Sequence, residues 1–147
     1  MLDLEKTPHA CFKVESASMA IADNDFPQAL ANQLQPRFSS VRVKKTPFKT
    51  SWAVVLQLER QSYAAVLGPS KHGNDEWILL LGPPDASDRI RGDESTVSQE
   101  GLIRISREVH AVLTTIRGIS AVRWYFEGPR TQTAAVATPD ELPWGQA

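Results

Sequence analysis

The sequence predicts an α+β fold, a two-layer sandwich in which a mainly antiparallel sheet of four to six strands packs against one long amphipathic helix over residues 96–117. The first observation is the helical spacing of apolar residues in that range, and the second is an alternating run directly after it. The third is a series of alternating runs between residues 41 and 81 with hairpin-length connections. Such connections favour antiparallel pairing, which distinguishes an α+β from an α/β protein.

Length and composition indicate one globular domain over residues 1–147, with a C-terminal tail at 139–147. Lysine and arginine number 16 against 17 acidic residues, so the net charge of −1 gives no general attraction for nucleic acid. The single cysteine, Cys11, excludes an intrachain disulfide and favours a cytoplasmic location. We expect neither a signal peptide nor a membrane span, because no long apolar run is present.

The N-terminal part of the chain predicts one short strand and one short helix. Residues 11–14 fit a strand at the edge of the sheet. A helix over residues 25–35 follows, since Asp25 is a suitable N-cap and Pro27 fits the first turn. Pro36 then ends the helix.

The middle of the chain alternates with the period of strands. We expect strands at residues 41–44, 52–58, 63–67 and 77–81, joined by turns rich in polar residues, glycine and proline. The run 77–81 is apolar on both faces, which is typical of a central strand.

The long helix over residues 96–117 has a continuous apolar stripe. Its members recur at three- and four-residue spacing and are Leu102, Ile105, Val109, Val112, Leu113 and Ile116. Burying each is worth roughly 1.5 to 3 kcal/mol, so the helix must pack on another element. Thr96 and Gln99 form a capping-box pattern at its start, and Gly118 supplies the left-handed position after its end.

The residues after Gly118 supply the surface on which this helix packs. Val122, Trp124 and Phe126 alternate with polar or half-polar neighbours and predict a strand with one buried face. A last strand is expected at residues 133–138.

Charged residues before the long helix form the first candidate ligand site. They lie in the loop 82–94 and are Asp85, Asp88, Arg89 and Arg91, to which His72 from a neighbouring turn can be added. A helix N-terminus can hold an anion through its free N–H groups, and the arginines could assist. The carboxylates of the same loop compete for that position, so a solvated loop with local ion pairs is the simpler interpretation.

The sequence predicts no catalytic residue, metal or cofactor. His9, His72 and His110 are far apart in the chain and lack metal-ligand spacing. His9 and Cys11 would share a face of a strand, but nothing in the sequence near Cys11 lowers the pKa of its thiol, so we expect an inert cysteine.

Nucleic-acid binding is an unfavoured interpretation of the most basic stretch. That stretch contains Lys44, Lys45, Phe48, Lys49 and Trp52. Exposed aromatic rings among cations can stack on bases. The tryptophan, however, belongs to the apolar set of its own strand, which favours a place in the core.

The C-terminal tail contains two apolar residues that polar residues surround. Leu142 and Trp144 flank Pro143, and this composition is unusual for a disordered tail. Two interpretations stay open: Trp144 packs back on its own sheet, or it anchors on a partner or on a second copy of the chain.

The leading hypothesis is a small cytoplasmic, non-enzymatic binding or accessory protein. It associates with a protein partner or a second copy of itself through its sheet edge or its C-terminal tail. The alternative is a small-molecule or anion-binding domain, or an enzyme, that uses the loop 82–94 and His72.

Overall fold

The structure is a computed structural model that describes residues 7–14, 25–45, 52–58, 61–69, 76–82, 99–116, 118–127 and 132–144. The described chain forms β1 (Thr7–Val14), α1 (Asp25–Leu34), β2 (Ser40–Lys45), β3 (Trp52–Leu58), β4 (Gln61–Pro69), β5 (Glu76–Gly82), α3 (Gln99–Leu113) and β6 (Ile119–Glu127). Two short 3-10 turns, η2 (Gln35–Arg37) and η3 (Pro139–Glu141), follow α1 and precede the C-terminal end.

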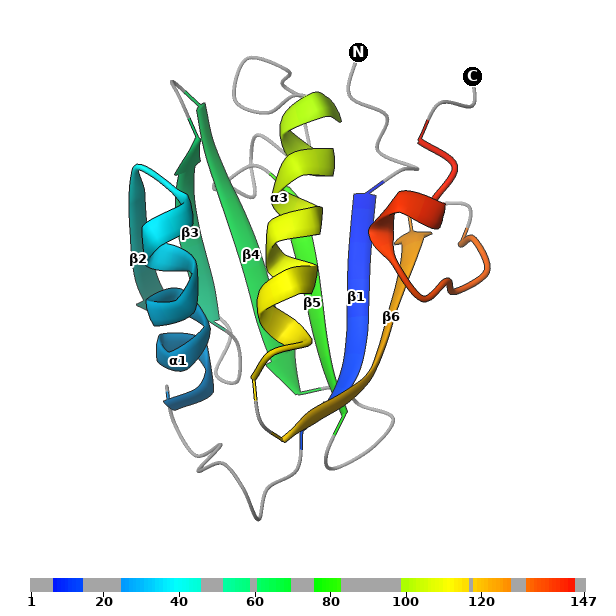
Figure 1. The fold of residues 1–147 in the computed structure, drawn as a ribbon, viewed down its shortest axis with the longest axis horizontal. Coiled ribbons are helices and arrows are strands. Elements are labelled where there is room, and N and C mark those ends of the chain that lie inside the picture. Colours follow the sequence, from blue (N-terminus) through cyan, green and yellow to red (C-terminus); the bar gives the residue numbers. More distant parts are fainter. Residues whose placement is uncertain are drawn as a thin grey trace.

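The strands form one six-stranded sheet in the order β2-β3-β4-β5-β1-β6. Every pair is antiparallel, so the predicted α+β class with a mainly antiparallel sheet is confirmed. Figure 1 shows α1 in front of β2 and β3, and α3 in front of the middle of the same sheet. Both helices therefore cover one face, and we call the opposite side of the sheet the far face.

The position of β1 corrects the prediction of an edge strand. β1 lies between β5 and β6. It pairs with β5 from His9 to Lys13 and with β6 from Thr7 to Val14. Ala10, Phe12 and Val14 point toward the helices and are buried. The first strand of the chain thus closes the sheet between two strands that come much later in the sequence, which local alternation cannot reveal.

The helix α3 has the predicted buried stripe but is shorter than predicted. Ile105 and Val109 are fully buried against the sheet, as expected. The helix ends at Leu113 instead of residue 117, and residues 96–98 lie outside the described residues. The Thr114 and Thr115 hydroxyls donate hydrogen bonds to carbonyls of the last turn, which competes with continued helix.

Gly118 adopts the predicted left-handed conformation, with φ of 93°. This residue turns the chain from the end of α3 into β6, a conformation that glycine adopts without steric cost. β6 then buries Val122, Trp124 and Phe126 toward α3, as the alternation predicts.

The predicted strand at residues 133–138 does not form. Instead, residues 132–144, which we call the C-terminal segment, run beside β6 and make only two isolated bridges, Trp124 with Val136 and Glu127 with Gln132. The segment then turns through η3 and ends against α3 and β6 (Figure 1).

Candidate functional site

The two edges of the sheet differ in what the chain places along them. β2 forms one edge. In the described chain it pairs with β3 on one side and with no strand on the other. β6 forms the other edge, and the C-terminal segment lies along it. An edge strand presents unpaired N–H and C=O groups that can accept a further strand. The difference between the edges therefore decides where another chain could pair.

The β6 edge is satisfied by the chain itself. The Trp124 N–H donates to the carbonyl of Val136 at 2.8 Å, and the Val136 N–H donates back at 2.7 Å. The Phe126 N–H donates to the Thr133 hydroxyl at 2.8 Å, and the Phe126 carbonyl accepts from the Thr133 N–H at 2.9 Å. The outward backbone groups of this half of β6 are thus occupied.

A bulge distorts the other half of β6. The register with β1 shifts between Cys11 and Lys13, where two residues of β6, Ala121 and Val122, lie opposite the single residue Phe12 of β1. Ala121 lies in this bulge with φ of 56°, a left-handed value that is uncommon for a residue with a side chain. Bulges of this kind twist an edge away from regular pairing.

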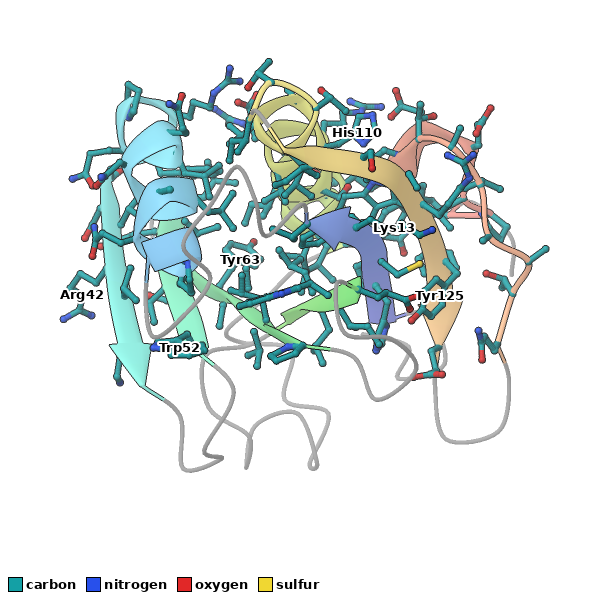
Figure 2. All side chains as sticks on the ribbon, turned by 90° about the horizontal axis from the view of Figure 1, so that it is seen from below. Lys13, Arg42, Trp52, Tyr63, His110 and Tyr125 are labelled. Atoms are coloured by element: carbon teal, nitrogen blue, oxygen red, sulfur yellow. The ribbon has the colours of Figure 1, made fainter. Side chains whose placement is uncertain are left out.

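The β2 edge is regular and carries positive charge. Val41 is buried under the helices and Val43 is partly buried. Arg42 and Lys44, which alternate with them, are exposed on the far face. Figure 2 shows Arg42 at the outer side of β2, pointing away from the rest of the molecule. The edge thus presents a backbone with one apolar and one cationic side.

The register places one row of residues on the far face across the whole sheet. Reading from β2 to β6, the members of the row are Lys44, Ala53, Val66, Leu80, His9 and Tyr125. The middle of the row is apolar and partly buried. The cation lies at one end, and an aromatic pair lies at the other.

His9, Tyr125 and Glu127 form a cluster at the β6 end of this row. The rings of His9 and Tyr125 stack with centroids 5.3 Å apart, and the His9 Nε2 lies 3.5 Å from a carboxylate oxygen of Glu127. Both rings are buried, and Figure 2 places Tyr125 on the side of β6 away from α3. The spacing of His9 and Cys11 is visible in the sequence. Tyr125, in contrast, is 116 residues after His9 and lies beside it only through the register of β1 with β6.

The surroundings of this cluster favour the protonated forms of the Tyr125 phenol and of the nearby Cys11 thiol. Burial, followed by the charge of Glu127, raises the pKa of Tyr125 to about 12. Burial also raises the pKa of Cys11, and Glu76 adds to this effect while Arg123 opposes it. At neutral pH the phenol and the thiol are therefore hydrogen-bond donors, and the thiol is a weak nucleophile.

Leu142 and Trp144, which were considered as anchors on a partner, lie against their own chain. Leu142 and Trp144 are 5% and 9% exposed. The Trp144 and Phe126 rings meet edge to face with their centroids 4.9 Å apart. The indole N–H of Trp144 donates to the carbonyl of Pro139 at 2.8 Å. Gln99 at the start of α3 donates to the Trp144 carbonyl at 2.7 Å. Of the two interpretations, the structure therefore supports the packing of Trp144 on its own sheet.

A second contact joins α3 to β6 close to the C-terminal segment. The Trp124 indole N–H donates to the Nδ1 of His110 at 3.0 Å, and the two rings meet edge to face. Burial lowers the pKa of His110, while the nearby carboxylate of Asp140 opposes this shift. Arg107 pairs with Asp140, so the charged groups of α3 and η3 face each other beside the histidine.

The loop residues proposed as a ligand site, Asp85, Asp88, Arg89, Arg91 and His72, lie outside the described residues. Within the described part of the chain, no group of three or more His, Cys, Asp or Glu side chains could hold a metal ion. None of the helices in these ranges is long and apolar enough to cross a membrane. Comparisons with protein-family models, curated proteins and solved structures give no match.

Proposed function

We propose that this protein is a small cytoplasmic, non-enzymatic binding protein that accepts a strand of another chain along the outer edge of β2. The observation that carries the proposal is the contrast between the edges. The outward groups of Trp124 and Phe126 in β6 are bonded to the C-terminal segment, whereas β2 has its strand partner on one side in the described chain. Strand addition to such an edge is a recurring mode of peptide recognition.

The side chains of β2 support pairing with a strand that alternates in polarity. We infer a two-layer arrangement in which α1 covers the end of the sheet beside β2. Val41 and Val43 face that helix, so apolar residues of an added strand would lie on the same side. Main-chain hydrogen bonds would supply affinity, and the alternate side chains would supply selectivity.

The packing of the C-terminal segment supports the edge as the association surface instead of the tail. Trp144 and Leu142 are already buried by Phe126 and the rest of the core cluster. To contact another chain, they would first have to leave these contacts, and the lost burial of the indole opposes that step. No described residue favours the enzyme alternative, which rests on the loop 82–94 and His72.

The test is to select extended peptides that bind the intact protein and then to map which backbone amides they protect from exchange with deuterium. We expect protection of amides within Ser40–Lys45 and little change at Trp124 and Phe126. Binders that instead protect the C-terminal segment, or the far-face cluster at His9 and Tyr125, would contradict the proposal.

A further inference from the structure

We infer that the strand accepted by β2 is an acidic, extended segment of a different protein and not β2 of a second copy. This inference rests on the proposed pairing at β2. It names the chemistry of the partner, which the open edge by itself leaves undefined.

Within the described strands, Arg42 and Lys44 have no acidic neighbour on the far face. Arg42 is in register with Val55 of β3, and Lys44 is in register with Ala53. The next strand places Ala64 and Val66 beside those residues. Across the described strands next to β2, the far face therefore offers apolar side chains to the two cations and no carboxylate. Both side chains are exposed, so they are available to a chain that arrives from the outer side of β2.

Pairing of two β2 strands would bring like charges together. In an antiparallel pair that keeps the helices of both copies on one side, residues of the same face lie opposite each other. In the two registers that overlap β2 most fully, Arg42 would then face Arg42 or Lys44 of the second copy. Like charges directly opposite are destabilising in a sheet, and cationic edge residues are a common defence against self-pairing.

A heterologous strand with carboxylates at alternate positions reverses this effect. Its acidic side chains would lie opposite Arg42 and Lys44 on the far face, and its apolar side chains would extend the face under α1 beside Val41 and Val43. Opposite charges across a strand pair stabilise it, and they also speed the encounter. The geometry thus selects a partner segment that alternates acidic and apolar residues.

Three synthetic peptides test the inference with the full chain. One alternates valine and glutamate, the second alternates valine and lysine, and the third is the glutamate peptide with its backbone amides methylated. We expect the glutamate peptide to bind at least about tenfold more tightly than the lysine peptide in a fluorescence anisotropy titration at low salt. The double variant Arg42→Glu with Lys44→Glu should reverse this preference. The matched control, Lys13→Glu with Arg123→Glu, changes the same charge on β1 and β6 and should keep it.

The outcomes separate the inference from the proposed function. Equal binding of the glutamate and lysine peptides, abolished by methylation, overturns the acidic partner and leaves strand addition standing. Binding of the methylated peptide as tightly as the unmethylated one overturns strand addition, and the inference falls with it. Failure of all three peptides to bind overturns the inference. It is also overturned if light scattering shows that the wild-type protein is a dimer and that the Arg42→Glu, Lys44→Glu double variant is a monomer.

Discussion

The hydrogen bond from Trp124 to His110 is a single contact whose strength depends on pH. The indole of Trp124 is fully buried, and its N–H needs an acceptor, which the Nδ1 of neutral His110 supplies. A protonated imidazole carries hydrogen on both nitrogens and cannot accept. Burial accordingly lowers the pKa of His110 below its ordinary value of 6.5.

The predicted result is a stability that falls in acid. Because the folded-state pKa of His110 is lower than the unfolded one, its contribution is complete above about pH 6.5 and is lost as the pH decreases through the folded-state pKa. Chemical denaturation between about pH 5 and 8 measures this dependence. The variant His110→Asn keeps an acceptor at the position of Nδ1 but does not titrate, so its slope with pH should be smaller. Equal slopes for both proteins would contradict the assignment.

Cys11 illustrates a residue whose neighbours make it unreactive. Burial and Glu76 raise the pKa of its thiol, so the thiolate is scarce at neutral pH. Cys11→Ser should therefore keep the melting temperature and peptide binding, and alkylation of wild-type Cys11 by iodoacetamide should be slower than that of a small free thiol. Fast, stoichiometric labelling at neutral pH that abolishes peptide binding would show that the thiol has a role.

At the scale of elements, α3 is the helix that fixes the core. Ile105 and Val109 are both fully buried. Truncation of either to alanine leaves a cavity and should reduce the free energy of unfolding by about 2 to 4 kcal/mol. Gln33→Ala on the exposed side of α1 is the control and should change it by less than about 0.5 kcal/mol. Losses that small at both Ile105 and Val109, measured by urea unfolding, would contradict the packing of α3.

The elements that sequence predicted well are those with long local periodicity. The stripe around Ile105 and the alternation through Trp124 are repeated often enough to define a helix and a strand without knowledge of their neighbours. The position of β1 depends instead on pairing with residues about seventy and more than a hundred positions away, and the short pattern of residues 11–14 cannot specify that pairing. The end of α3 was misplaced because Thr114 and Thr115 bond to the backbone, a local competition that apolar spacing does not register.

The candidate site was less accessible to sequence than the fold. Alternation at Val41 and Val43 predicts a strand, but whether that strand lies at an edge follows only from the complete strand order. The stacking of His9 on Tyr125 likewise requires the register between β1 and β6. Nonlocal pairing therefore decides which exposed residues lie together, and a single sequence contains little information about it.

At the scale of the whole molecule, the C-terminal segment joins α3 to β6. Trp144 contacts Phe126, and Arg107 of α3 pairs with Asp140 of η3. Deleting residues 139–147 should therefore lower the thermal midpoint by about 10 °C, since a buried indole and its neighbours are lost. Deleting only residues 145–147 keeps all of these contacts and is the control.

The same deletion distinguishes packing within one chain from packing between copies. Because Trp144 packs on its own chain, light scattering should show the same oligomeric state for the deleted and the undeleted protein. Two results together would contradict the described packing. The larger deletion would leave the thermal midpoint unchanged, and acrylamide would fully quench the Trp144 fluorescence of the intact chain.

The two edges of the sheet differ in the described chain: β6 is bonded to the C-terminal segment, whereas β2 has a strand on its β3 side only. Residue-resolved amide hydrogen exchange of the free protein, followed by NMR, tests this difference most directly. We expect slow exchange at Trp124 and Phe126, whose N–H groups are bonded to the C-terminal segment, and alternating fast and slow exchange along Ser40–Lys45. Uniformly slow exchange along β2, or exchange at Trp124 and Phe126 as fast as in an unpaired strand, would contradict it.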